Sequence, residues 1–176
     1  MKNGIKAATE NPTSKVSIQP VFSHEVATDK VSNQQQSGRC WMFAALNTFR
    51  HKLNGTLGLK DFELSQNYTN FWDKLEKANY FLENIIETAS EDEDSRLVSW
   101  LLDTPQQDGG QWDMLVSIIE KYGVVPKSAM PETFQSGKSA DLNHLLNERL
   151  RTDAVIFEKS FHRKERYCRF ERRNAC

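Results

Sequence analysis

The sequence predicts a mainly helical domain, and three observations support this fold class. Apolar residues recur at intervals of three and four in several segments between positions 40 and 150, the spacing that places them on one face of an α-helix. Stretches of strict apolar and polar alternation, which predict strands, are scarce. The chain has 176 residues, of which 38% are apolar, enough for one hydrophobic core of ordinary size.

The polar first segment, residues 1–32, is expected to form an extended arm. It contains Pro12 and Pro20, together with short β-prone pieces such as VSIQPVF. Proline disfavours the helical conformation of the residue before it, so an extended chain is the simpler expectation.

The first predicted helix begins at Cys40. Its apolar positions follow helical spacing: Met42, Leu46, Phe49 and Leu53. Asn54 and Gly55 come next, and both residue types readily adopt the left-handed conformation that ends many helices. Cys40 is therefore expected at the N-terminus of a helix that stops near residue 54.

A second, longer helix is predicted from residue 65 to about residue 89. One face carries the apolar period, with Tyr68, Trp72, Leu75, Asn79, Leu82 and Ile86. The acidic run SEDEDS then gives a negative start to a short helix that Pro105 ends. We interpret the acidic run as solvated surface.

Two more helices are predicted in the second half. In QWDMLVSIIEKYG, Gly123 closes a helical stripe formed by Trp112, Leu115, Ile119 and Tyr122. Ser139 is a favourable N-cap for a helix that runs through Leu150. Residues 157–176 differ in character, with seven Lys or Arg against three acidic residues, and no helical stripe continues into them.

The stretch NQQQSGRCW, residues 33–41, combines several features of a nucleophilic site. Cysteine reacts as the thiolate, and the first turn of a helix stabilises that anion through its unpaired N–H groups and dipole. Gly38 permits close backbone approach, and Trp41 can form one wall of a cleft. The Gln34 side-chain amide and the N–H of Cys40 could both donate to an oxyanion. The alternatives are a solvated glutamine and a cysteine that packs as a small core residue.

The segment NQQQSGRCWMFAALN resembles the active-site segment of papain-like cysteine peptidases, in which a glutamine lies six positions before the nucleophilic cysteine and a tryptophan follows it. Ser37 stands where the common papain form has a cysteine, and Arg39 where it has a small residue. Both are usual in the bleomycin hydrolase and aminopeptidase C branch. FELSQNY, DGGQWDMLVSIIEKYGVVPKSAMPE and LNHLLNERLR also look like this branch, so the resemblance covers about residues 20–155.

The resemblance implies an α+β papain-like cysteine peptidase fold, represented here mainly by its helical N-terminal half, with the β-rich half missing. Three segments follow: an arm at 1–32, the helical half at 33–156, and a basic tail at 157–176 that is unlike the family. The implied reaction releases N-terminal residues from peptides through an acyl-enzyme. Cys40 would be the nucleophile, Gln34 the oxyanion donor, and Gly109 and Gly110 the substrate-binding wall. A structural turn is the alternative for the two glycines.

Members of this branch are cytoplasmic, need no metal or organic cofactor, and form a homo-hexameric barrel with inward-facing active sites. Their own C-terminal end occupies part of the cleft, which restricts cleavage to free N-termini. The net charge of -1 and the lack of long apolar stretches agree with a protein that binds neither nucleic acid nor membrane. Three widely spaced cysteines argue against a disulfide scaffold.

A papain-like peptidase also needs a histidine to pair with the thiolate and an asparagine to orient the imidazole. His24 precedes the motif, and His51 lies roughly 16 Å beyond Cys40 along the same predicted helix. His144 is in a leucine-rich helix, and His162 is in the basic tail. We therefore expect a truncated form with little or no turnover of its own. The alternative is a non-catalytic helical fragment that acts at most as a binding module.

The basic tail allows two further interpretations. It could bind nucleic acid through interleaved basic and aromatic residues, although a solvated charged end is simpler: Arg163, Lys164, Arg166, Tyr167, Arg169, Phe170, Arg172 and Arg173. A zinc site at His162, Cys168 and Cys176 is weaker, because the spacing matches no usual pattern and lacks a fourth ligand. The abrupt change near Phe157 suggests a frameshift or gene decay, which the DNA sequence after codon 155 would test.

Overall fold

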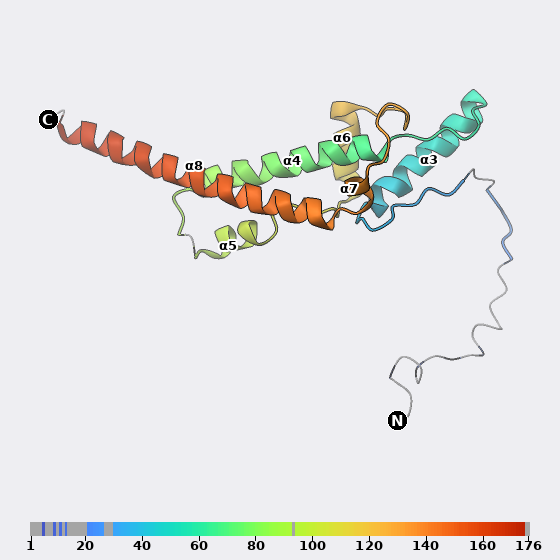
Figure 1. Ribbon diagram of the computed structural model, residues 1–176, viewed down its shortest axis with the longest axis horizontal. Coiled ribbons are helices and arrows are strands. Elements are labelled where there is room, and N and C mark those ends of the chain that lie inside the picture. Colours follow the sequence, from blue (N-terminus) through green and yellow to red (C-terminus); the bar gives the residue numbers. More distant parts are fainter. Residues whose placement is uncertain are drawn as a thin grey trace.

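The computed structural model describes residues 21–26, 30–92 and 94–174, with the separate positions 5, 9, 11 and 13, and side-chain environments only as far as residue 161. Within this part of the chain the regular structure is helical, and the only β-pairs are two isolated bridges. The helices are α3 (Cys40–Leu57), α4 (Gln66–Glu87), α5 (Arg96–Asp103), α6 (Trp112–Tyr122), α7 (Phe134–Gly137) and α8 (Ala140–Asn174) (Figure 1). The mainly helical fold class is confirmed.

The N-terminal arm is described only in part. Residues 21–26 are not helical, as expected, whereas Ile5, Thr9 and Thr13 have helical conformation. The Thr9 hydroxyl donates to the carbonyl of Ile5 at 3.0 Å. This bond spans one helical turn, which the prediction of an extended arm did not include. The other residues of the arm lie outside the described residues.

The predicted helix ends are confirmed where a side chain or a glycine caps the helix. Ser65 starts α4 by accepting a hydrogen bond from the N–H of Tyr68 at 3.0 Å, and Ser95 starts α5 in the same way with Val98 at 3.3 Å. Gly123 ends α6 and donates its N–H to the carbonyl of Ile119 at 2.8 Å. These ends follow from local chemistry, which a sequence reveals directly.

Two helix ends differ from the predictions. Helix α3 continues past Asn54 and Gly55 and ends at Gly58, whose φ of 62° is the left-handed conformation expected three residues earlier. Helix α8 runs to Asn174, through the tail in which no helical stripe was found. The segment contains neither glycine nor proline and is rich in straight-chain residues, which favour helix without an apolar face.

Helix α4 is the centre of the fold. It packs against α3, α5, α6 and α8, and α8 runs alongside it (Figure 1). One apolar cluster joins α4, α5 and α8 through Phe81, Ile85, Leu101, Leu150 and Ala154. A second cluster joins α3 to α6 through Met42, Ala45 and Leu115, with Trp41 and Ile119 packed against it. The core is thus divided between two places.

The buried face of α4 is more polar than its apolar stripe predicted. Leu75 and Ile86 of that stripe are each 46% exposed. The buried residues of α4 are instead Gln66, Asn67, Thr69, Asn70, Asp73, Lys74, Phe81 and Ile85. Likewise Trp112 of α6 is 62% exposed while Ile118 is buried. The first half of α4 faces the loops that surround Cys40. Two of its buried polar side chains bind loop backbone there: Asn67 donates to the Pro131 carbonyl at 2.8 Å and Lys74 to the Gln107 carbonyl at 3.0 Å.

Candidate active site

Cys40 is the first residue of α3, and its side chain is exposed. The N-cap residue Arg39 gives no side-chain hydrogen bond to the first turn, and that turn carries no acidic residue. The N–H groups at a helix start lack intrahelical partners and carry the positive end of the helix dipole. The predicted position of Cys40 at a helix N-terminus is therefore confirmed, and its thiol is accessible there.

The loop before Cys40 is closed by its own hydrogen bonds. The Ser37 hydroxyl donates to the backbone carbonyl of Gln34 at 2.7 Å and accepts from Nε of Arg39 at 2.9 Å. The N–H of Gln35, which has a φ of 56°, donates to the Asn33 side chain at 2.7 Å. Gln34 is half-buried between these contacts. Ser37 therefore links the backbone of the predicted oxyanion donor to the residue before the thiol.

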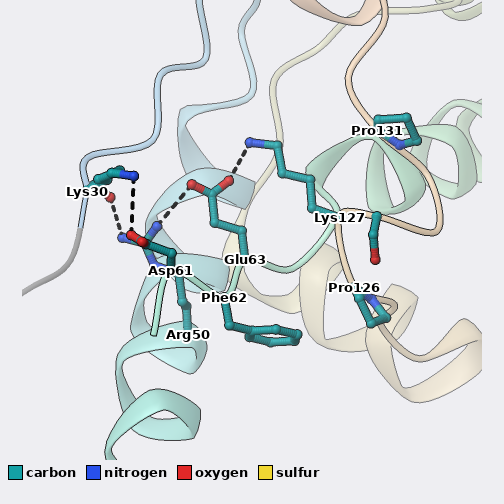
Figure 2. A pocket seen from close by; sticks show the side chains of 9 residues that line it. Lys30, Arg50, Asp61, Phe62, Glu63, Pro126, Lys127 and Pro131 are labelled. Carbon is teal, nitrogen blue, oxygen red and sulfur yellow. Dashed lines mark hydrogen bonds and ion pairs between the residues drawn. The ribbon is translucent and has the colours of Figure 1, made fainter. Parts of the chain in front are cut away.

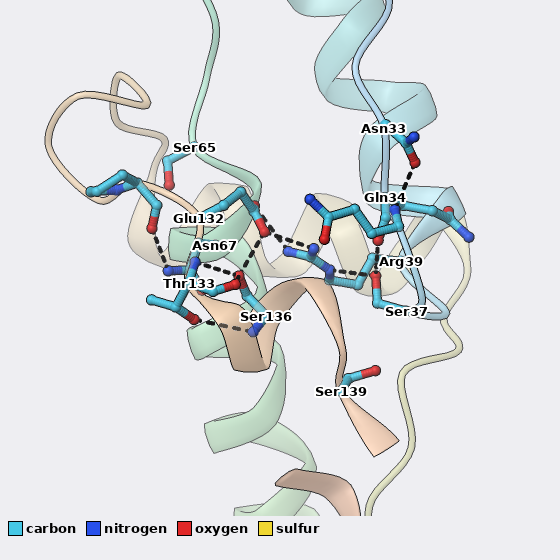
Figure 3. Close-up of polar contacts among 12 residues, drawn as sticks. Asn33, Gln34, Ser37, Arg39, Ser65, Asn67, Glu132, Thr133, Ser136 and Ser139 are labelled. Atoms are coloured by element: carbon cyan, nitrogen blue, oxygen red, sulfur yellow. Dashed lines mark hydrogen bonds and ion pairs between the residues drawn. The ribbon is translucent and has the colours of Figure 1, made fainter. Parts of the chain in front are cut away.

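The Arg39 side chain anchors this loop to the chain that leads into α7. It is fully buried and donates to the two carboxylate oxygens of Glu132 at 3.0 and 2.8 Å (Figure 3). Ser136 donates to the same carboxylate at 2.6 Å, and the guanidinium lies 5.1 Å from the ring centre of Phe43. Burial raises the pKa of Glu132, but the hydrogen bonds from Arg39 and Ser136 outweigh it, so the pKa lies below its ordinary value.

Gly110 lies against the indole ring of Trp41. A Cβ atom at Gly110 would be 2.4 Å from Cζ2 of Trp41, so a larger residue would displace the ring. At Gly109 the nearest atom to such a Cβ is 3.6 Å away, and no steric reason requires glycine. Lys77 donates to the Gly109 carbonyl at 2.7 Å and lies 5.7 Å from the Trp41 ring centre. The structure thus brings the two glycines beside the residue that follows Cys40.

An open hollow of about 320 Å³ adjoins this contact. Its lining comes from α3 and α6, with Trp41, Ala44, Ala45, Thr48, Trp112 and Leu115. Cys40, Ala44 and Thr48 are spaced by four residues, so they share one face of α3, and all three are exposed. The face of α3 that carries the thiol is therefore open and borders an apolar hollow.

A larger hollow, of about 530 Å³, lies elsewhere (Figure 2). Arg50 lines it, ten residues and roughly 15 Å along α3 from Cys40. Its charged groups pair with one another: Glu63 binds both Arg50, at 3.3 Å, and Lys127, and Lys30 lies 3.5 Å from Asp61. The hollow is thus separate from the thiol, and each of its charged side chains already has an ion-pair partner.

The described residues hold no group of three or more His, Cys, Asp or Glu side chains that could bind a metal ion. His51 is exposed on α3, and Nε2 of His144 lies 3.5 Å from the Glu148 carboxylate on α8. The side chains of His162, Cys168 and Cys176 lie outside the described residues. In the part of the chain that the structure covers, no helix has the length and apolar character to cross a membrane.

A sequence profile of the Peptidase C1-like family matches residues 1–174. The chain belongs to this family. It is 96% identical over 165 residues to aminopeptidase C of Listeria monocytogenes, a match that covers 94% of this chain and 37% of the relative. Aminopeptidase C of Lactobacillus helveticus is 58% identical over 154 residues, covering 88% and 34%. The crystal structure of PepW from Lactobacillus rhamnosis matches with 62% identity and a TM-score of 0.87, covering 93% and 36%.

The chain spans little more than a third of the length of these relatives. Peptidase C1-like membership and the match to PepW confirm the papain-like fold, represented here by its helical N-terminal half. The family match includes most of the basic tail, which was expected to be unlike the family. The division into three segments stays a prediction, as do the roles of Cys40, Gln34, Gly109 and Gly110.

Sequence reasoning missed the buried and half-buried charged residues that hold the site together. Glu132 binds Arg39 across 93 residues, and Asp108 binds Gly38 across 70. Helical periodicity carries no signal for such contacts. The sequence offered one indication of these two residues: Asp108 begins DGGQW and Glu132 ends SAMPE, and both stretches resemble the family.

Proposed function

We propose that this chain forms the thiol-bearing side of a cysteine aminopeptidase, which releases N-terminal residues from peptides through an acyl-enzyme. The observation that carries the proposal is the exposed Cys40 at the start of α3, followed directly by a tryptophan that packs on Gly110. Membership of the Peptidase C1-like family and the identity to two aminopeptidases C support it.

In this reaction the Cys40 thiolate attacks the carbonyl carbon of the first peptide bond and forms a tetrahedral oxyanion. The Gln34 side-chain amide and the N–H of Cys40 donate hydrogen bonds to that oxygen. Collapse breaks the C–N bond and expels the amine of the remaining peptide, which takes a proton from a general acid. Water then hydrolyses the thioester and regenerates the thiol. The backbone of Gly109 and Gly110 binds the substrate beside the thiol.

The general acid in papain-like peptidases is a histidine paired with the cysteine. His51 is about three turns along α3 from Cys40, and His144 is engaged by Glu148. We therefore expect the 176-residue chain to hydrolyse aminoacyl fluorogenic substrates no faster than its Cys40→Ala variant. Turnover that depends on Cys40 would contradict this part of the proposal and would show that the chain supplies its own acid.

Thiol labelling separates the peptidase site from a helical fragment without one. An epoxysuccinyl peptide, a reagent that needs a thiol and a peptide-binding surface, should modify Cys40 in preference to Cys168 and Cys176, as mass mapping would show. Iodoacetamide, which needs only the thiol, is the matched control reagent. Equal labelling of the three cysteines by the epoxysuccinyl peptide would favour the non-catalytic binding module.

Cytoplasmic location is a further part of the proposal, and assembly into a homo-hexamer is proposed for the whole enzyme rather than for this truncated chain. Their support is the resemblance to the bleomycin hydrolase and aminopeptidase C branch. Light scattering of the purified chain tests this expectation: a mass below that of a hexamer supports it, and a mass six times that of the chain would show that the truncated form assembles on its own.

A further inference from the structure

Asp108 accepts hydrogen bonds from residues on both sides of Cys40. The N–H of Gly38, two residues before the thiol, donates to Oδ2 of Asp108 at 2.9 Å. The indole N–H of Trp41, directly after the thiol, donates to the backbone carbonyl of Asp108, also at 2.9 Å. Asp108 itself directly precedes Gly109. The segment that carries the thiol is therefore attached at both ends to the residue that begins the glycine wall.

The Asp108 carboxylate is in turn held by the body of the fold. Lys74 of α4 and Asn143 of α8 donate to Oδ1, each at 2.8 Å, and Ser139 donates to Oδ2. The side chains of Asp108 and Lys74 are each 9% exposed. Burial alone would raise the pKa of Asp108. The hydrogen bonds from Lys74, Ser139, Gly38 and Asn143 outweigh burial, so the pKa lies below its ordinary value and the group stays ionised.

Gly38 lies directly against the side chain of Asp108. A Cβ atom on Gly38 would lie 2.8 Å from Cβ of Asp108, so only glycine permits this contact. The preceding carbonyl, that of Gln107, accepts hydrogen bonds from Lys74 at 3.0 Å and Lys77 at 2.9 Å. The peptide that precedes Asp108 is thereby fixed to α4.

We propose that Asp108 is a positioning residue that sets the Cys40 thiol against the wall formed by Gly109 and Gly110, by joining both sides of Cys40 to α4 and α8. The inference rests on the proposed function, because thiol and wall act together only when a peptide binds between them. Asp108 acts through Gly38 and Trp41 and is not a catalytic residue.

The test uses the full 176-residue chain with Asp108→Ala, and with Asp108→Asn in case the alanine variant does not fold. Asparagine keeps the size of the side chain but has one acceptor oxygen instead of two. Ser139→Ala is the matched control, because it removes one donor to the same carboxylate and leaves the bonds to Gly38 and Trp41. Helical circular dichroism shows which variants remain folded.

Two readouts decide the inference. Losing a charge-assisted hydrogen bond should speed hydrogen exchange at the Gly38 amide by about tenfold or more in the Asp108 variants. The ratio of Cys40 alkylation rates by an epoxysuccinyl peptide and by iodoacetamide should also fall by about tenfold, because only the first reagent needs the wall. In the Ser139→Ala control both values should change by less than about threefold.

Unchanged exchange at Gly38 in a folded Asp108 variant would overturn the inference. Faster exchange with an unchanged ratio would also overturn it, since the bond would then stabilise the loop without placing the thiol. Equal effects of Ser139→Ala would assign the change to the start of α8 instead. If wild-type Cys40 reacts with the epoxysuccinyl peptide no faster than N-acetylcysteine does, the proposed function fails, and exchange at Gly38 alone still decides whether Asp108 holds the loop.

Discussion

Replacing Glu132 with glutamine should destabilise the chain and loosen the loop before Cys40. The Arg39 side chain is 1% exposed and that of Glu132 is 22% exposed. Breaking a fully buried ion pair costs about 3–5 kcal/mol. Water reaches Glu132 in part and glutamine keeps one acceptor oxygen, so we expect a loss of about 2–3 kcal/mol, the range of hydrogen bonds to charged groups.

Urea denaturation followed by circular dichroism at 222 nm measures this loss. With a slope of about 2 kcal/mol per molar urea, the midpoint should fall by about 1–1.5 M. Glu148→Gln is the matched control, because that carboxylate is 60% exposed and forms an ion pair with the exposed His144 on the same helix. The control should stay within about 0.5 kcal/mol of wild type. An equally small effect of Glu132→Gln would refute the conclusion that this pair anchors the loop.

Two further predictions follow from the site. Gly110→Ala should lower the free energy of unfolding by about 1–3 kcal/mol, because its Cβ would overlap the Trp41 ring. The control Gly109→Ala should lower it by less than about 1 kcal/mol. Similar melting temperatures for both variants would contradict the contact between Gly110 and Trp41. The pKa values of Asp108 and Glu132 are lowered in the folded chain, so their stabilisation is complete above the unfolded-state pKa values of about 4. It is lost as pH falls through the lower folded-state values. The urea midpoint should therefore decline below about pH 4, and a midpoint that stays constant down to pH 2 would exclude this contribution.

The sequence was informative wherever a structure depends on neighbouring residues. Ser65 and Gly123 were predicted as helix boundaries, because a cap bonds within its own turn. The short helix α5 was expected after the acidic run, but its cap Ser95 was not named. The position of Cys40 at a helix start followed in the same way from the apolar period after it. For α3 the true end at Gly58 was missed, because Gly55 is also a plausible stop and only the surrounding structure selects between them.

The polar interior could not be predicted from periodicity. Asp73 and Lys74 are buried on α4, where an amphipathic pattern places charges outside. Lys74 is buried because Asp108 and the Gln107 carbonyl bind it, and these partners lie more than thirty residues away. The candidates Cys40 and Gln34 came from local chemistry together with resemblance, and Gly109 and Gly110 came from resemblance alone. The groups that hold them came only from three-dimensional contacts.

Apolar clusters hold the helices together, whereas polar contacts hold the loops around Cys40, so order at the site and cohesion of the fold have different physical origins. Around Phe81 and Leu101 the helices are held together by the burial of apolar surface away from water. Around Arg39 and Asp108 the loops are held by directional bonds between fixed charges. Regions of this kind open as separate cooperative units. Substitution of single polar side chains can therefore change the geometry around the thiol, while the apolar cluster of α4, α5 and α8 still folds.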